Sequence, residues 1–518
     1  MLRRISCFAL IATVSGCQDG ALADESGGST AGTTSGSSAA DSATTPDPTV
    51  DATADPDDGS SDDDPGPGPG GGQSCDDLVS QITAAGIGEH LAAFVEHADA
   101  NAGNRAAGSP GYDASAAYVE QTLAAAGYDV QIQPFEFERF SVNADPVLEQ
   151  TAPQPVAFAA SDFAVADYSG AGDVTAPLTP VDLQLGPGNA ATSGCEPGDF
   201  GTFPAGNIAL IQRGNCTFAA KVQNAQAAGA AGVVRFNQGS DGGNQGLFGG
   251  TLGAGNGIDI PVVFATYGTG ETLAGTNGAV VHLVVDATIE LVETHNVIVD
   301  TPWGDPNDLI MYGAHLDSVP AGPGINDNGT GSAALLEVAK AVADCSLRRR
   351  VRFAWWGAEE VGLLGSNHYV EQLSPEERAT HRFYLNFDMI GSPNYARLIY
   401  DGDGSAFDSP GPGNSDELEA LFIDYFASLG LPTGAAEFNL RSDYAAFVMA
   451  GIPSGGVFTG AEGTKTQQQA ELYGGQAGEP FDACYHQGCD GFENVDLELA
   501  AQIGEAIAHS VEVYALDE

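Results

Sequence analysis

The chain contains the stretch LIMYGAHLDS at residues 309–318, in which an apolar run turns polar at His315 and Asp317. Residues 309–312 predict the end of a buried strand, because large apolar side chains follow one another without interruption. His315 and Asp317 then stand where that strand meets solvent. A neutral imidazole is a good zinc ligand, and a carboxylate two residues later can hold its other nitrogen. The stretch therefore predicts a metal site at a strand end, although a strand-end histidine is more often an ordinary surface residue.

Apolar strands and helices with an apolar stripe alternate on both sides of this stretch. We expect strands at 128–137, 296–300, 309–312, 351–356, 383–388, 397–400 and 453–458. We expect helices at 78–85, 87–101, 113–126, 330–343, 363–372, 416–429 and 497–515. Such alternation predicts an α/β fold with a mixed, largely parallel sheet flanked by helices. In such sheets, binding sites form beyond the ends of the strands.

Five more metal-binding side chains fall at strand ends or in loops of the same segment, and they are Asp327, Glu359, Glu360, Asp388 and His486. Each alone has an ordinary explanation, as a helix cap, a turn former or the solvated start of a helix. Together with His315 they form a set of two histidines and four carboxylates. That set suits two zinc ions bridged by a carboxylate.

Several short motifs carry a resemblance to a known family, and they are AHLDS (314–318), NDNG (326–329), GAEEVG (357–362), NFDM (386–389) and CYHQ (484–487). In these motifs the chain resembles the exported bacterial di-zinc aminopeptidases. RSDY (441–444) and FTGAEG (458–463) also resemble the leucine-preferring members. The likeness covers about residues 75–140 and 293–518. It implies a zinc peptidase domain with a phosphorylase/hydrolase-like zinc exopeptidase fold.

The segment between these two parts has short strands, many turns and much Gly, Ala, Val and Thr. Over residues 180–240 it resembles the protease-associated domain, a small β-rich module. The resemblance implies an inserted domain at 141–292. Such an insert shapes access to the site, contacts substrate or has a purely structural role.

The family resemblance implies which side chains hold metal. Asp327 would bridge both zinc ions. His315 and Asp388 would complete one site, and Glu360 and His486 would complete the other. In the family the peptide bond after the bridging aspartate is cis, so we also expect a cis bond between Asp327 and Asn328.

The resemblance likewise implies the catalytic side chains. Glu359 would act as general base and then as general acid, and Asp317 would orient His315. Tyr485 would help to hold the developing oxyanion, and the backbone carbonyl of Arg441 would help to hold the substrate amine. These roles imply a zinc-dependent aminopeptidase that releases N-terminal residues, large apolar ones above all, through a hydroxide bridging two zinc ions.

The formal charge of this centre also favours an aminopeptidase. Two zinc ions, a hydroxide and four carboxylates leave a net negative charge, which attracts the ammonium group of a peptide with a free N-terminus. A carboxypeptidase would need cationic side chains to hold the terminal carboxylate of its substrate, and Arg441 is the only evident candidate nearby. A carboxypeptidase or dipeptidase on the same scaffold is the alternative. A surface binding protein with a catalytically dead peptidase domain is another.

The 518-residue chain is strongly acidic, with a net charge of −53. That charge excludes nucleic-acid binding, which needs a basic face. The acidic surface fits either adaptation to high salt or an ordinary acidic exported protein. Calcium binding is possible, but no ligands can be assigned to it. We expect a monomer.

The N-terminus predicts export. Arg3 and Arg4 precede a short apolar run at 8–14, and small residues then lead to Cys17. This segment, 1–17, resembles a lipoprotein signal peptide, which implies a lipid anchor at Cys17 and a cell-envelope location. The alternative is a plain signal peptide and a secreted protein.

Residues 18–74 carry 12 acidic and no basic side chains. Their Gly/Ser/Pro-rich composition predicts a disordered tether.

Six cysteines remain in the body, and an even number in an exported chain indicates disulfides. Spacing favours the pairs Cys484–Cys489 and Cys195–Cys216. The pair Cys75–Cys345 follows by elimination.

Overall fold

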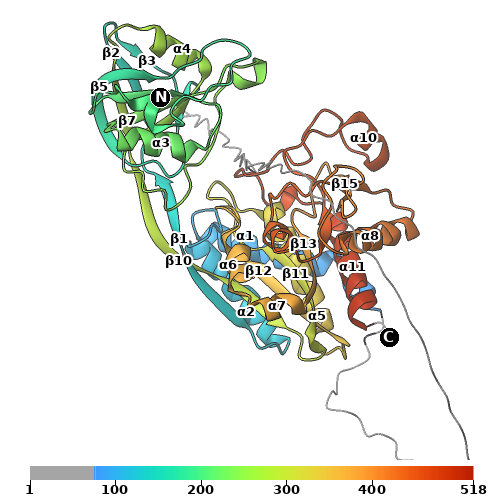
Figure 1. Cartoon of the computed structure of the whole chain (residues 1–518). Helices are drawn as coiled ribbons and strands as arrows, with labels where there is room; N and C mark the ends of the chain where they lie inside the picture. The colour runs from blue at the N-terminus through green and yellow to red at the C-terminus, as the bar shows by residue number, and fades with distance from the viewer. Residues whose placement is uncertain (1–74, 76, 517–518) are drawn as a thin grey trace, which may run out of the picture.

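The computed structural model describes residue 75 and residues 77–516. The expectations for the signal segment, for Cys17 and for the tether at 18–74 lie outside these residues. The chain forms two lobes, each built on an eight-stranded sheet, and the long strands β1 and β10 run from one lobe into the other (Figure 1). Among the residues described, no helix has the length and apolar character needed to cross a membrane.

The larger lobe contains a mixed sheet in the order β1-β10-β12-β11-β13-β16-β14-β15. Strand β11 pairs in parallel with β12 and β13, and β13 pairs in parallel with β16. The antiparallel pairs β1–β10, β10–β12 and β14–β16 lie outside this centre. The strands are β1 (Gln131–Val142), β10 (Ala287–Asp300), β11 (Asp305–His315), β12 (Arg349–Trp356), β13 (His381–Phe387), β14 (Leu398–Tyr400), β15 (Gly434–Ala436) and β16 (Ser454–Phe458). The predicted parallel core is confirmed.

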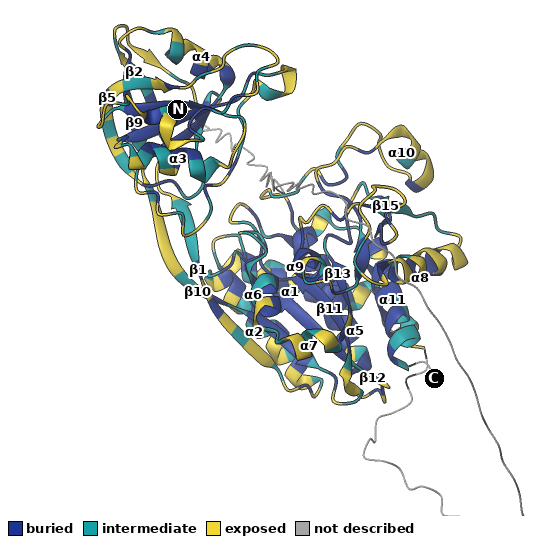
Figure 2. Cartoon of the chain, in the orientation of Figure 1, coloured by how far each residue is buried: buried dark blue, intermediate teal, exposed yellow. Residues whose placement is uncertain are grey.

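Helices cover both faces of this sheet. Successive side chains of a strand point to opposite faces, so a strand made of apolar residues needs cover on both. Tyr312 packs into a core shared with α1 (Ala84–Ala100), α2 (Pro110–Ala125), α5 (Thr330–Val342), α8 (Ser415–Ser428) and α11 (Leu497–Val511). Its neighbour Met311 packs on the opposite side against α6 (Leu364–Gln372) and α9 (Tyr444–Met449). The short helices α7 (Pro375–Thr380) and α10 (Gln467–Tyr473) complete the lobe. Figure 2 shows the central strands buried and the outer helices exposed on one side.

The smaller lobe has its own sheet and its own apolar core. Its strand order is β3-β2-β9-β5-β6-β7-β8-β4, with α3 (Phe218–Ala227) and α4 (Tyr267–Gly275) as its helices. The strands are β2 (Val147–Ala152), β3 (Val156–Ala157), β4 (Phe163–Val165), β5 (Gly172–Val181), β6 (Ile208–Gln212), β7 (Gly232–Phe236), β8 (Val262–Ala265) and β9 (Val280–Val285). Strands β1 and β10 run across the expected boundaries at 140/141 and 292/293. The division into domains stays a prediction.

One predicted helix is wrong. Residues 78–85 form only a 3₁₀ turn at Val79–Gln81, and α1 begins at Ala84. The cause is Thr83, whose side chain accepts a hydrogen bond from the backbone N–H of Gly86 and caps α1. A capping threonine fixes the start of a helix whatever apolar periodicity precedes it.

All three predicted disulfide pairings are confirmed: Cys75–Cys345, Cys195–Cys216 and Cys484–Cys489. The first closes a loop of 270 residues and ties the start of the described chain to the end of α5. The last closes a loop of five residues.

Candidate metal centre and active site

Three neighbouring parallel strands end at one place in the larger lobe and carry much of the predicted set. His315 is the last residue of β11. Glu359 and Glu360 follow β12, and Asp388 follows β13. Parallel strands end at the same edge of a sheet, so these side chains meet there.

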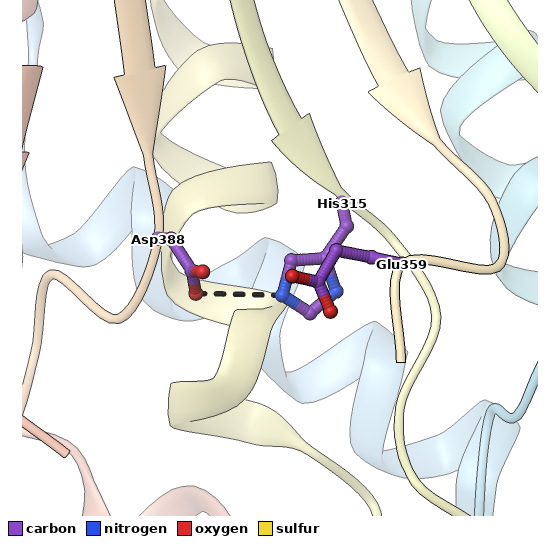
Figure 3. A group of neighbouring side chains, drawn as sticks. All are labelled: His315, Glu359 and Asp388. Carbon is purple, nitrogen blue, oxygen red and sulfur yellow. Dashed lines mark ion pairs between the residues drawn. The ribbon is translucent and has the colours of Figure 1, made fainter. Parts of the chain in front are cut away.

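His315 is 1% exposed and lies against two carboxylates. Its Nε2 is 3.3 Å from Oδ1 of Asp327 and 3.4 Å from Oδ1 of Asp388. Its Nδ1 lies 3.1 Å from the backbone oxygen of Asp317, which can only accept a hydrogen bond. Nδ1 therefore donates a hydrogen bond to that oxygen, and Nε2 is the nitrogen that faces the two carboxylates. Figure 3 shows His315 and Asp388 facing each other, with Glu359 beside them.

His486 forms a second group with Asp327 and Glu360. Its Nε2 is 3.1 Å from Oδ2 of Asp327 and 3.0 Å from Oε2 of Glu360. It lies in the five-residue loop closed by Cys484–Cys489. The two oxygens of Asp327 therefore face two different histidines.

Asp327 lies in an irregular turn at Ile325–Gly329, directly before α5. The cis peptide bond predicted between Asp327 and Asn328 is confirmed. The backbone N–H groups of Asn326 and Asp327 donate to the two carboxylate oxygens of Asp490, at 2.9 and 3.0 Å. Asp490 is 1% exposed and follows the loop of His486. It therefore joins the turn of Asp327 to the loop that carries His486.

The carboxylate of Asp317 has further partners besides His315, the one expected. Its Oδ1 lies 3.7 Å from Nδ1 of His315, and the backbone carbonyl of Asp317 is the nearer group. The carboxylate accepts the backbone N–H groups of Glu359 and Glu360, at 3.1 and 3.3 Å. Asp317 thus contacts His315 through its backbone carbonyl and its carboxylate, and the two glutamates through its carboxylate.

Two carboxylate oxygens in this centre are buried without a hydrogen-bond partner among the described residues. They are Oδ1 of Asp388 and Oε1 of Glu360, one in each histidine group. Burying a negatively charged oxygen without a donor is costly. The clusters His315–Glu359–Asp388 and Asp327–Glu360–His486 each have donor atoms close enough to bind one ion. Imidazole and carboxylate donors are the ligands that zinc accepts, so the residues fit zinc.

The electrostatics agree with a centre built for cations. Burial lowers the pKa of His486, but the charges of Glu360 and Asp327 outweigh it and raise that pKa to about 11. Burial and the charge of Asp327 raise the pKa of Glu360 to about 7. Burial, together with the negative charge of Glu360, raises the pKa of Glu359 well above its usual range. Carboxylates crowded in this way repel one another unless positive charge lies between them.

A cavity of about 330 Å³ opens over the centre. Asp327, Glu359, Glu360, Asp388 and His486 line one side of it. The other side is largely apolar, and its large apolar members are Met389, Leu398, Tyr400, Phe407, Tyr444, Phe458 and Phe481.

Tyr485 also lines the cavity, and its hydroxyl accepts a hydrogen bond from Nη2 of Arg441 at 3.3 Å. Nη1 of Arg441 forms an ion pair with Glu462 at 2.7 Å. Burial raises the pKa of Tyr485 far above its usual range, so the hydroxyl keeps its proton and can donate it in a hydrogen bond.

Sequence reasoning missed three side chains that hold this centre in place. Ser442 donates to Oδ2 of Asp388 at 2.7 Å, and Asp490 holds the turn of Asp327. Arg105 is fully buried and donates to the backbone oxygens of Leu316, Pro323 and Gly324. It ties together the loops of Asp317 and Asp327. A lone arginine in sequence looks like a surface residue, so nothing in the sequence signals this role.

Comparison with known proteins matches each of the two lobes to a known family. Residues 296–511 match the model of peptidase family M28, and residues 174–273 match that of the PA domain. The chain is 51% identical to an aminopeptidase of Pseudomonas aeruginosa over 82% of this chain and 80% of that protein. It is 42% identical to "Probable leucine aminopeptidase 2" of Aspergillus fumigatus, over 80% of this chain and 79% of that protein.

Two further proteins are similar over most of their length. "Probable lipoprotein aminopeptidase LpqL" of Mycobacterium tuberculosis is 39% identical over 85% of this chain and 86% of that protein. The crystal structure of BSAP, a zinc aminopeptidase from Bacillus subtilis, superposes with a TM-score of 0.60. It is 26% identical, and the match covers 84% of this chain and 96% of that one.

Proposed function

We propose that this chain, which belongs to peptidase family M28, is a zinc aminopeptidase that holds two zinc ions beyond the ends of β11, β12 and β13. The observation that carries the proposal is the orientation of Asp327. Its Oδ1 faces His315 and its Oδ2 faces His486, and each histidine also contacts one further carboxylate. A carboxylate shared in this way suits a bridge between two cations. His315 and Asp388 would hold one ion with it, and Glu360 and His486 the other.

Bound zinc supplies Lewis-acid chemistry, which makes water nucleophilic near neutral pH and polarises a peptide carbonyl. Glu359 is the residue that would move the proton. Its side chain lies beside the His315 group and lines the cavity (Figure 3). A carboxylate at this position can take up the proton of the attacking water and can then pass it to the leaving amine.

Tyr485 would stabilise the negative charge that develops on the carbonyl oxygen. Tyr485 lines the cavity and keeps its phenolic proton, and a donor held in place in a partly enclosed site is worth more than one in bulk water. Arg441 donates a hydrogen bond to that hydroxyl and is itself paired with Glu462. Arg441 is the one lysine or arginine among the described residues that line the cavity, and its charge is already offset. The cavity therefore favours an ammonium group over a carboxylate, which supports an aminopeptidase over a carboxypeptidase.

The apolar wall of the cavity supports a preference for a large apolar N-terminal side chain. Met389, Tyr400 and Phe458 can bury such a side chain, and each additional methylene buried contributes roughly 0.8 kcal/mol. A relative named leucine aminopeptidase agrees with this preference.

Leucine amide should be hydrolysed and its N-acetylated form should not. Zinc removal should abolish the reaction and zinc addition should restore it. Equal cleavage of the N-blocked substrate would contradict the proposal.

The assignment of Glu359 can be tested separately. Glu359→Gln should keep both zinc ions and lower kcat by roughly 10²–10⁴-fold, because it removes general acid–base catalysis without removing a metal ligand. Glu437→Gln is a matched control, since Glu437 lines the same cavity and is exposed. It should keep kcat within a few fold. Metal content and kcat measured together decide the matter: a Glu359→Gln protein that loses zinc would make Glu359 a ligand instead of the base.

We also propose that the mature chain is an exported monomer anchored by lipid at Cys17, with peptides and no nucleic acid as its partners. The similarity to a relative named a lipoprotein supports the anchor. Expressed with its N-terminus intact in a bacterium, the wild type should partition into detergent and a Cys17→Ala variant should not. Equal partitioning of both would refute the anchor.

A further inference from the structure

Three carboxylates gather beside the substrate cavity, away from the two histidines. Asp401 follows β14, Asp403 lies two residues later, and Glu419 lies in α8. One oxygen from each lies within 4.8 Å of the others. None of the three has an ion-pair partner among the residues that the structure describes, so their negative charges face one another.

Asp401 is the member that demands an explanation, because it is 0% exposed. Its Oδ2 accepts the backbone N–H groups of Ala406 and Phe407, at 3.0 and 2.9 Å. Its Oδ1 is buried and, within the described part of the chain, has no hydrogen-bond partner. A buried anionic oxygen without a donor costs free energy that folding must overcome.

The other two carboxylates each accept a backbone hydrogen bond. Asp403 accepts the backbone N–H of Ser405 at 2.7 Å, and Glu419 accepts that of Asp403 at 3.1 Å. Burial and the charges of Asp403 and Asp401 raise the pKa of Glu419. Asp403 itself is exposed, so water reaches one side of the cluster. Oxygen donors from three acidic side chains therefore converge on a point that is open to solvent on one side.

We infer that Asp401, Asp403 and Glu419 bind a calcium ion. Calcium takes six to eight oxygen ligands in flexible geometry, so three carboxylates and several waters can complete its shell. The cluster contains no nitrogen or sulfur donor, unlike a typical zinc site. Magnesium demands stricter octahedral geometry and dehydrates reluctantly. The ion would supply the positive partner that Oδ1 of Asp401 lacks.

The site lies in a position to affect the substrate cavity. Oδ2 of Asp401 holds the backbone of Phe407, and Phe407 lines the cavity together with Tyr400. A cation that fixes Asp401 therefore fixes one wall of the cavity at a distance from the catalytic groups.

The test is calcium binding to the zinc-loaded full chain, after calcium is removed and zinc is restored. Titration calorimetry with CaCl2 in about 0.1 M KCl should give one saturable site, and calcium should raise Tm by roughly 2 °C or more. Asp403→Asn and Glu419→Gln should each weaken that affinity by about tenfold or more, because each removes a charged ligand. Asp424→Asn is the matched control, since Asp424 is exposed on the same helix α8 and lies outside the cluster. It should bind as the wild type does.

Calcium-free Tm separates a lost site from a damaged fold. Both cluster variants should melt no lower than the wild type without calcium, because each removes a like charge from the cluster. An absent saturable site in the wild type, or unchanged affinity in Asp403→Asn and Glu419→Gln, would overturn the inference. An equal response to MgCl2 at the same concentration would overturn the assignment to calcium.

Discussion

At the level of single residues, Asp317 connects the two histidine groups because it contacts members of both. Its carboxylate fixes the backbone of Glu359 and Glu360, and its carbonyl fixes Nδ1 of His315. It is fully buried, so these bonds are not exchanged with water. A group that orients ligands without binding the metal typically changes metal affinity by 10–100-fold when it is altered.

Replacing Asp317 by Asn should therefore weaken zinc binding by roughly 10–100-fold. An amide offers one acceptor oxygen where the carboxylate offers two, so one glutamate N–H loses its partner. Zinc affinity can be measured by competition with a chromophoric chelator. Tm of the zinc-free protein is the control, because it reports any damage to the fold alone. Zinc affinity equal to that of the wild type would show that Asp317 does not position the ligands.

At the level of secondary structure, the sequence predicted those features that depend on neighbouring residues alone. The apolar run 309–312 predicted β11 and the strand-end position of His315, and the run at 383–387 did the same for β13 and Asp388. The buried network around Asp490 and Arg105 could not be predicted, because its bonds join residues more than 160 apart in the chain. The start of α1 was also missed, since a local cap at Thr83 overrode the apolar pattern.

His381, the first residue of β13, should make stability depend on pH. Its Nδ1 donates to the backbone oxygen of Glu377 at 2.8 Å, and Tyr369 OH donates to its Nε2 at 2.7 Å. Arg352 in turn donates to that hydroxyl. Burial, aided by the positive charge of Arg352, lowers the pKa of His381 from 6.5 to about 4. The folded chain therefore holds a neutral imidazole where the unfolded chain would bind a proton.

The stability that this imidazole contributes is fully present above pH 6.5 and is lost as the pH falls through 6.5 toward 4. Between pH 7 and pH 4.5 the wild type should lose about 2 kcal/mol of unfolding free energy through His381. Urea unfolding at both pH values measures it, with His381→Gln as the control that cannot titrate. Any zinc release affects both proteins alike, so the difference between them isolates His381. A constant difference across this range would contradict the expectation.

At the level of the whole molecule, two disulfides should serve different purposes. Cys75–Cys345 closes 270 residues and lies at the end of α5 away from Asp327, because α5 begins beside the metal centre and ends near Cys345. Cys484–Cys489 closes only five residues, but these include Tyr485 and His486. A cross-link stabilises mainly by restricting the unfolded chain, and the effect grows with the length of the loop it closes.

We therefore expect opposite effects from removing each pair. Replacing Cys75 and Cys345 by serine should lower the free energy of unfolding by about 2–5 kcal/mol and leave kcat near that of the wild type. Replacing Cys484 and Cys489 by serine should cost less stability but weaken zinc binding and lower kcat, since the loop that carries His486 loses its brace. Urea unfolding, zinc affinity and kcat of both double variants measure these effects. The two pairs would share one role if both variants lost stability and activity in the same proportion. The expectation would also be contradicted if the variant without Cys75–Cys345 bound zinc more weakly while the variant without Cys484–Cys489 bound it as the wild type does.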